Sequence, residues 1–205
     1  MQITLTKAGK RYNREWIFRG VDYTFLPGKT YAITGPNGSG KSTLLQVIAG
    51  AIMQTEGKVE YNNTSSNRAI PSVKAHEQLS FASPYLELIE EMTATEILQF
   101  HATFKPLTKS IPTILTEVGL ERSAHKQIRY FSSGMKQRLK LAQAFFCNTP
   151  VLLLDEPTTN LDEDGIALYH RLISNYAKDK MVIVSSNDKQ EYDFCGEVIS
   201  ISKYK

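Results

Sequence analysis

Apolar positions along the chain follow two periods, that of strands and that of helices. Runs in which apolar residues alternate or follow one another predict strands at Gln2–Lys7, Thr30–Thr34, Gly57–Tyr61, Gln78–Ala82, Val151–Asp155, Met181–Ser186 and Glu197–Ser202. Apolar residues spaced three or four apart predict helices at Lys41–Ile48, Ala94–Phe104, Ile111–Val118, Met135–Cys147 and Glu163–Ala177. Strands and helices alternate, so the pattern predicts an α/β fold.

Two of the predicted strands, Val151–Asp155 and Met181–Ser186, are almost entirely apolar. Such runs are typical of central parallel strands that are buried on both faces. Residues 87–148 are mostly helical and interrupt the series of strands. We therefore expect a single domain over residues 1–205, with an α/β core (1–86 and 149–205) and an inserted helical subdomain (87–148).

Composition narrows the classes of function. The formal net charge is +3 and no run of basic residues stands out, so we expect no nucleic-acid partner. Cys147 and Cys195 lie far apart without metal-type spacing, which suits a reducing compartment. The N-terminus lacks the apolar core of a signal peptide, and no window of about 18 apolar residues exists. We expect a chain that does not cross a membrane by itself.

The first chemical motif is GPNGSGKST, Gly35 to Thr43, between a predicted strand and a predicted helix. Glycines let the backbone amides of such a turn approach an anion, and the helix start adds further free amides. Lys41 supplies a positive charge for the outer phosphates, and Ser42 offers an oxygen to Mg²⁺. The alternative is a glycine-rich surface turn. With both flanks in place, the motif predicts a loop that binds the phosphates of a nucleoside triphosphate.

The second motif, VLLLDEP, delivers two adjacent carboxylates to the end of a buried strand. Ligands of open α/β sheets bind at that end. Asp155 is placed to hold Mg²⁺, and Glu156 could orient or deprotonate a water that attacks the terminal phosphate. The alternative is a strand that ends in a solvated acidic turn.

The third motif, YFSSGMKQRLKLAQAF, places two serines and a glycine before a strongly helical stretch. Ser132 and Ser133 are good helix N-caps, and the helix start presents amides and a positive dipole end. A second anion site in a chain with one phosphate loop makes sense if it serves the nucleotide of another copy.

With these motifs in this order, and TTNLD after DEP, the sequence closely resembles the ATP-binding cassette (ABC) ATPases over almost its whole length. The resemblance implies a P-loop NTPase core with a mixed or parallel sheet, an N-terminal antiparallel β part and the inserted helical subdomain. The residues that match the Walker A phosphate loop are Gly35, Asn37, Gly38, Gly40, Lys41, Ser42 and Thr43.

The resemblance also implies roles for residues outside that loop. Asp155 matches the Walker B aspartate and Glu156 the catalytic glutamate, while the signature motif at Ser132, Ser133 and Gly134 would touch the terminal phosphate across a dimer interface. Asp162 matches the D-loop aspartate. Tyr12 falls where the family places an aromatic that stacks on adenine; alternatively Tyr12 is an ordinary edge-strand aromatic, and Trp16 could stack instead.

Three positions depart from the family pattern. The signature reads FSSGM where L-S-G-G-Q is usual, so Met135 replaces a glutamine. Pro84 stands where the family has a glutamine that approaches Mg²⁺, and Asn187 stands in place of a histidine. Asparagine can hydrogen-bond a phosphate oxygen but cannot carry a charge. We expect an active but slow ATPase, with Lys41, Glu156 and Asn187 as its catalytic residues and Mg²⁺ bound with ATP.

Compact chains of this kind look like the separate ATPase subunits of bacterial transporters. The resemblance then implies a second ABC subunit, with a homodimer favoured, and an integral membrane permease that docks near Ser83–Thr93, where apolar and acidic residues alternate. Alternatively, that segment packs on its own core. The expected location is cytoplasmic, peripheral on the inner face of the cell membrane. The other reading of the function is a soluble ABC-type ATPase that acts in translation, repair or complex assembly.

Overall fold

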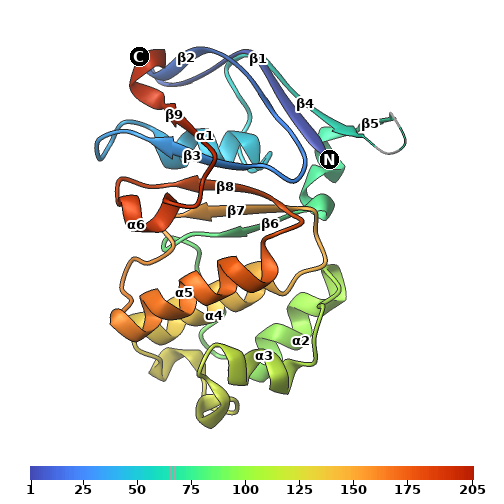
Figure 1. Cartoon of the computed structure of the whole chain (residues 1–205), viewed down its shortest axis with the longest axis vertical. Helices are drawn as coiled ribbons and strands as arrows, with labels where there is room; N and C mark the ends of the chain where they lie inside the picture. The colour runs from blue at the N-terminus through green and yellow to red at the C-terminus, as the bar shows by residue number, and fades with distance from the viewer. Residues whose placement is uncertain (65, 67) are drawn as a thin grey trace.

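A computed structural model describes residues 1–64, 66 and 68–205 (Figure 1). Its strands form two sheets. The antiparallel sheet has the order β2 (Glu15–Phe25), β1 (Gln2–Tyr12), β4 (Glu56–Asn63), β5 (Arg68–Ile70). The parallel sheet has the order β6 (Leu79–Ala82), β7 (Val151–Asp155), β8 (Met181–Ser185), β3 (Thr30–Thr34), β9 (Glu197–Ser200).

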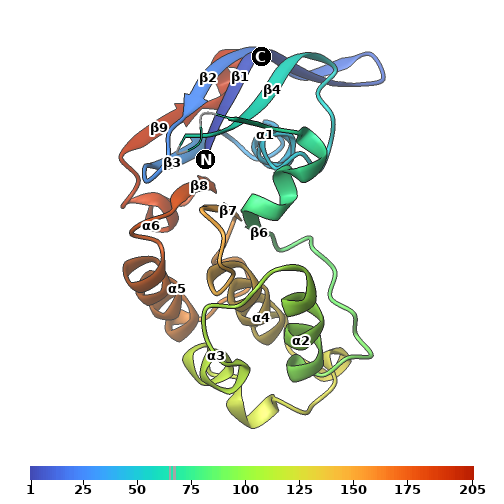
Figure 2. The same cartoon turned by 90° about the vertical axis from the view of Figure 1, so that its right-hand side faces the viewer.

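The helices lie on both sides of the parallel sheet. The α-helices are α1 (Lys41–Ile48), α2 (Ala94–Phe104), α3 (Ile111–Glu117), α4 (Ser133–Phe145), α5 (Glu163–Tyr176) and α6 (Lys189–Tyr192). Short 3₁₀ helices are η1 (Ser72–Gln78), η2 (Glu121–Ser123), η3 (Ile128–Tyr130) and η4 (Ile201–Tyr204). In both views α1 lies between the two sheets, and α4 and α5 cover the opposite face of the parallel sheet (Figure 2). The predicted α/β class, with a P-loop core and an antiparallel β part, is confirmed.

The central strands separate two hydrophobic cores. In β7, Val151 and Leu153 pack with α1 and the antiparallel sheet, whereas Leu152 and Leu154 pack with the helices on the other side. This division follows from the strand period, since successive side chains point to opposite faces. All four side chains are fully buried, which explains why the run is apolar throughout.

The predicted helices are confirmed to within two residues at their ends. Helix α4 begins at Ser133, two residues before the predicted start, because the Ser132 side chain accepts a hydrogen bond from the amide of Met135. Helix α2 begins with a capping box in which Thr93 and Glu96 satisfy each other's backbone amides. No helix in the described part of the chain is long and apolar enough to span a bilayer.

The structure contains one long strand, β2, that the hydrophobic pattern does not predict. Gly20 has a φ of +69°, and the partner strand shifts register between Leu5 and Ala8. Bulges of this kind break the alternation of apolar and polar residues. The strand predicted at Glu197–Ser202 is too long, because η4 begins at Ile201.

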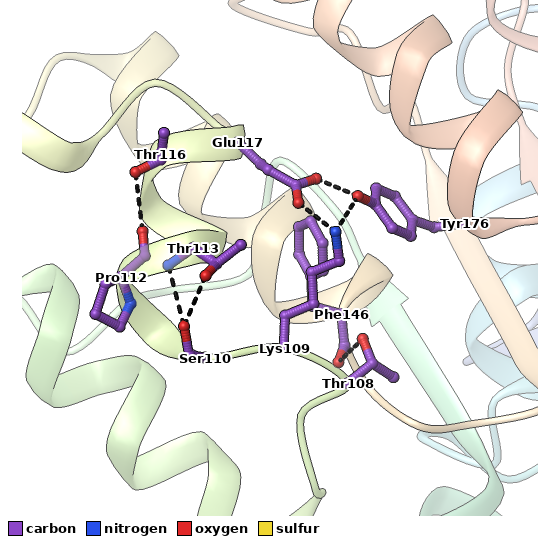
Figure 3. A network of polar contacts seen from close by, with 9 residues as sticks. All are labelled: Thr108, Lys109, Ser110, Pro112, Thr113, Thr116, Glu117, Phe146 and Tyr176. Atoms are coloured by element: carbon purple, nitrogen blue, oxygen red, sulfur yellow. Dashed lines mark hydrogen bonds and ion pairs between the residues drawn. The ribbon is translucent and has the colours of Figure 1, made fainter.

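A polar network attaches α3 to α5 (Figure 3). Lys109 Nζ lies 2.5 Å from Glu117 Oε1 and 2.7 Å from the Tyr176 hydroxyl, which also donates to Glu117. Below this network the rings of Phe146 and Tyr176 pack with centroids 4.8 Å apart. These contacts join the helices of residues 87–148 to α5, which follows the central strand β7.

Two glycines of the antiparallel sheet allow a direct test of how closely its strands approach one another. Gly20 and Gly57 have similar positive φ values of +69° and +75°, but a Cβ at Gly20 would meet nothing within 4 Å, whereas one at Gly57 would lie 2.2 Å from the carbonyl oxygen of Lys7. We expect Gly20→Ala to lower the free energy of unfolding by roughly 1–2 kcal/mol and Gly57→Ala by roughly 3 kcal/mol or more. Urea unfolding measures both values. Equal losses in the two variants would contradict the close approach at Gly57.

Candidate nucleotide-binding site

The loop between β3 and α1 is shaped by three glycines with positive φ: Gly35 (+153°), Gly38 (+73°) and Gly40 (+99°). A Cβ at Gly40 would lie 2.4 Å from Ile17 Cγ2, so only glycine fits between the loop and β2. A Cβ at Gly38 would meet nothing within 4 Å, which leaves the backbone there open to a ligand. The helix that follows has no side-chain N-cap, and its first amides remain available for an anion.

The Lys41 side chain is buried beneath this loop, with 4% of its surface exposed. Its ammonium donates to the carbonyl oxygens of Gly35 at 3.0 Å and Pro36 at 3.3 Å. The hydroxyl of Ser39 is also buried and has no hydrogen-bond partner among the described residues. The buried positive charge of Lys41 and the unpartnered hydroxyl of Ser39 both suit a loop that closes on an anionic ligand.

Asp155, at the end of β7, is fully buried and holds two hydroxyls. Its Oδ1 accepts from Ser42 Oγ at 2.9 Å, and its Oδ2 accepts from Ser83 Oγ at 3.2 Å. Burial raises the pKa of the Asp155 carboxyl, and the neighbouring serine hydroxyls offset part of that rise. Ser42 and Asp155, the residues predicted to bind Mg²⁺, therefore lie in direct contact.

Glu156 occupies a left-handed backbone conformation with a φ of +41°. Residues other than glycine rarely adopt this conformation, and such strain concentrates at functional sites. The amide of Glu156 donates to the carbonyl oxygen of Ser185 in β8 at 2.9 Å, which fixes the turn after β7. After this turn, Glu156 lines the same pocket as the phosphate loop.

Asn187, after β8, reaches the phosphate loop. Its Nδ2 lies 2.5 Å from Oδ1 of Asn37, and both side chains are exposed. Ends of β7 and β8 thus meet the loop after β3 at one edge of the parallel sheet. Parallel strands place their carboxyl ends together, so residues distant in sequence converge there.

These elements enclose a pocket of about 320 Å³ lined by Ile17, Asn37, Gly38, Gly40, Lys41, Ser42, Thr43, Tyr85 and Glu156. Gly35 is not among these lining residues, but its carbonyl oxygen accepts from Lys41. Tyr12 does not line the pocket: it ends β1 with 47% of its surface exposed, and the Lys10 ammonium lies 4.9 Å from the centre of its ring. Ile17 is the lining residue from that part of the chain, and stacking of Tyr12 on a base stays a prediction.

The residues present fit Mg²⁺ bound together with a nucleoside triphosphate. Mg²⁺ prefers oxygen ligands and usually takes one or two from protein, with phosphates and waters completing its shell. Ser42 and Asp155 supply such oxygens next to the phosphate loop. Among the described residues no cluster of three or more His, Cys, Asp or Glu side chains could hold a metal without such a ligand.

A second pocket, of about 310 Å³, lies at the start of α4 and is lined by Gly119, Leu120, Ser132, Ser133, Gly134, Met135, Arg138, Asn160 and Asp162. It brings together all four residues predicted for the signature motif and the D-loop. A Cβ at Gly134 would lie 3.1 Å from the carbonyl oxygen of Asn160, so a larger residue would push these segments apart.

Asp162 has a structural role in this second pocket. Its Oδ1 accepts from the amide of Gly165 at 2.9 Å, which caps α5, and from Arg138 at 3.1 Å. The Gly165 amide and then the Arg138 guanidinium lower the pKa of the Asp162 carboxyl. The motifs do not predict Arg138 as a site residue; its position on the same face as Gly134, four residues earlier on α4, is the signal that could have found it.

Three further residues escape the motifs: Tyr85 lines the first pocket, Ser83 bonds Asp155, and Glu191 bonds the segment after β7. Glu191, 3% exposed, accepts from the amide of Thr158 at 2.7 Å and from its hydroxyl at 2.5 Å. Burial raises the pKa of the Glu191 carboxyl. Its bonds link the segment after β8 to the segment after β7, a contact between residues 33 positions apart that no local motif reveals.

Comparisons with known proteins agree with this geometry. The sequence model of the family described as "ABC transporter" matches residues 18–159. An ABC transporter ATP-binding protein of Bacillus subtilis strain 168, YybJ, is 32% identical over 198 residues, covering 92% of this chain and 87% of its own. The hemin import ATP-binding protein HrtA of Staphylococcus aureus strain RF122, described as putative, is 28% identical and covers 96% and 93%.

Solved structures share the fold. The cassette MJ0796, a dimer in a post-hydrolysis state bound to ADP and Pi, has a TM-score of 0.83 and 25% identity over 97% of this chain and 93% of that one. A putative ABC transporter ATP-binding protein from Pyrococcus furiosus has a TM-score of 0.82 at 21% identity, with both chains covered completely. Family, relatives and pocket geometry agree: this chain belongs to the ATP-binding subunits of the ABC transporter family.

Proposed function

We propose that this chain binds and hydrolyses ATP, with Mg²⁺, to power transport through a separate integral membrane subunit. The observation that carries the proposal is the first pocket, where the phosphate loop, Asp155 and Glu156 converge. Gly38 and Gly40 would present backbone amides to the phosphates, Lys41 would neutralise the outer ones, and Thr43 would bond them from the first turn of α1.

Within that site, two carboxylates have different environments and different proposed roles. Asp155 is fully buried and bonded to two hydroxyls, which suits a group that holds its position next to Mg²⁺. Bound Mg²⁺ would neutralise charge on the terminal phosphates. Glu156 faces the pocket and would accept a proton from, or orient, the attacking water. Hydrolysis then breaks the bond between the terminal phosphorus and the bridging oxygen, giving ADP and phosphate.

The second pocket supports a dimer in which two chains sandwich two nucleotides. Ser132 and Gly134 start α4, whose free amides and positive dipole end favour an anion. No phosphate loop of the same chain lines that pocket, so its phosphate would come from a second subunit, for which we favour an identical copy. Ser133 and Asp162 would complete this contact.

An apolar groove supports a membrane partner. We call it the docking groove; its residues are Phe81, Leu86, Glu87, Leu88, Ile89, Ile97, Phe100, His101, Phe104, Lys140 and Gln143. Leu86, Ile89, Phe100 and Phe104 keep 40–70% of their surface exposed there. Four of its residues, Leu86 to Ile89, belong to the segment Ser83–Thr93, and its apolar lining with a few charged side chains suits the apolar face of an amphipathic helix. The cassette would accordingly sit in the cytoplasm on the inner face of the membrane, attached through its partner.

Three replacements support a slow ATPase. Pro84 has no side-chain oxygen for Mg²⁺ or water, Met135 removes a polar group from the second pocket, and Asn187 is neutral. Loss of one preorganised donor typically costs on the order of 100- to 1,000-fold in rate. Lys41, Ser42, Asp155 and Glu156 remain, so we expect hydrolysis to persist.

Replacing Glu156 tests the composite site. In Glu156→Gln, turnover should fall by about 100-fold or more, because the general base is lost while ATP binding remains. The ATP-bound dimer should then accumulate in size-exclusion chromatography with ATP and Mg²⁺. Glu60→Gln, the same change at an exposed position of β4, should behave as wild type. A Glu156→Gln protein that binds ATP but elutes only as monomer would contradict the shared site.

Asn187→His tests whether the lack of a positively charged side chain at this position limits the rate of ATP hydrolysis. If the neutral side chain limits the rate, histidine should raise ATP turnover by about tenfold, equivalent to about 1.4 kcal/mol in the barrier. The exposed Asn175 on α5 offers a matched control, Asn175→His, which should leave turnover unchanged. A lower rate in folded Asn187→His would mean that the 2.5 Å contact between Asn187 and Asn37 is itself required, and an unchanged rate would mean that the neutral side chain does not limit turnover.

Substitutions that change the charge of the docking groove test whether it binds a membrane partner. Glu87→Lys and Phe100→Glu should abolish recovery of an integral membrane protein in a membrane-fraction pull-down, while ATP affinity stays unchanged. Glu87 is preferable to Glu90, because Glu90 pairs with Lys136 at 2.5 Å and its reversal would disturb the cassette. Met53→Glu, at an exposed apolar position away from the groove, is the control. No membrane protein with the unmodified chain would favour the soluble ATPase instead.

A further inference from the structure

The segment after β6 forms a tight turn, Ser83-Pro84-Tyr85-Leu86, at the boundary between the first pocket and the docking groove. The amide of Leu86 donates to the carbonyl oxygen of Ser83 at 3.2 Å, which closes the turn. Pro84 is its second residue, where the fixed φ of proline favours turn formation. Proline therefore makes this segment rigid at the position where a flexible polar side chain would have reached the metal.

Three contacts hold the turn in place. Ser83 is 2% exposed, and its hydroxyl donates to Asp155 Oδ2 at 3.2 Å while accepting from the amide of Tyr85 at 3.3 Å. On the other side, the Lys140 ammonium donates to the carbonyl oxygen of Pro84 at 2.5 Å. Lys140 is itself 8% exposed, so this hydrogen bond offsets part of the cost of burying its ammonium. The backbone of Tyr85 is consequently held close to Asp155 through Ser83.

Adjacent residues of this turn line two different pockets. Tyr85 lines the first pocket together with Lys41, Ser42 and Glu156. Leu86 lines the docking groove. Tyr85 is 75% exposed, whereas Ser83 in the same turn is buried. A tyrosine side chain combines an apolar ring with a polar hydroxyl that can bond a ligand at a pocket edge.

We propose that the Tyr85 hydroxyl is a catalytic residue of this cassette and donates a hydrogen bond to the terminal phosphate of bound ATP. The inference rests on the proposed ATPase function. A phenol is a neutral donor that can stabilise the negative charge on a transferring phosphoryl group without changing its own protonation. It supplies from position 85 the polar contact that Pro84 cannot make.

Tyr85→Phe tests the proposal, since it removes one hydroxyl and keeps the ring. We expect kcat to fall on the order of 10- to 100-fold while the dissociation constant for ATP changes by less than about threefold, as for a contact made mainly in the transition state. Steady-state phosphate release gives kcat, and fluorescence titration of a labelled ATP gives the affinity. Tyr85→Ala should lower kcat at least as far.

Tyr204→Phe, the same change at a half-buried tyrosine of η4 outside the pocket, is the matched control and should keep wild-type kcat. Wild-type kcat in both folded Tyr85 variants would overturn the proposal while leaving the ATPase function intact. By contrast, failure of the unmodified chain to bind or hydrolyse ATP would overturn the proposed function itself. Equal losses in Tyr85→Phe and Tyr204→Phe would also contradict a specific role for Tyr85.

Discussion

The buried carboxylate of Asp155 is the constraint on which the rest of the site depends. A carboxylate without exposure is costly unless hydrogen bonds satisfy it. Here Ser42 from the start of α1 and Ser83 from the turn after β6 each supply a hydroxyl. One side chain therefore fixes the phosphate loop, the central strand and the turn relative to one another. Removing it would leave both hydroxyls without this acceptor and would free the three segments to shift.

This arrangement is possible because the parallel sheet has two buried faces. Val151 and Leu153 face one core and Leu152 and Leu154 the other, so a one-residue shift of β7 would exchange the side chains packed in each core and move Asp155 away from Ser42 and Ser83. The strand therefore ends at a defined point, and Asp155 and Glu156 follow there. Neighbouring parallel strands end at the same edge, which brings the segments after β3, β6, β7 and β8 into one site.

The replacements at Pro84 and Asn187 have structural consequences that the motif comparison alone does not show. Pro84 forms a turn whose neighbours, Ser83 and Tyr85, face Asp155 and the pocket respectively. Asn187 bonds Asn37 within the phosphate loop. Tyr85 beside Pro84, and Asn187 itself, therefore place polar groups at the edge of the sheet where the family usually has a glutamine and a histidine. The proposed slow turnover and the proposed role of Tyr85 both follow from this rearrangement.

The sequence by itself determined the fold class, the helices α1 to α5, the glycine-rich phosphate loop and the adjacent carboxylates of Asp155 and Glu156, because each depends on local periodicity or on residues close together in the chain. It did not predict the short helix α6. The motifs alone select Lys41, Ser42, Asp155 and Glu156, and the structure places all of them at one pocket or in contact with it. The strand β2 escaped prediction because Gly20 and a bulged partner strand remove the alternating pattern. Only the tertiary structure decided that Ser83 bonds Asp155, that Tyr85 faces the nucleotide pocket, and that Ile17 rather than Tyr12 lines it. These contacts join strands far apart in sequence, and their geometry depends on sheet order and turn direction, which residue spacing does not encode.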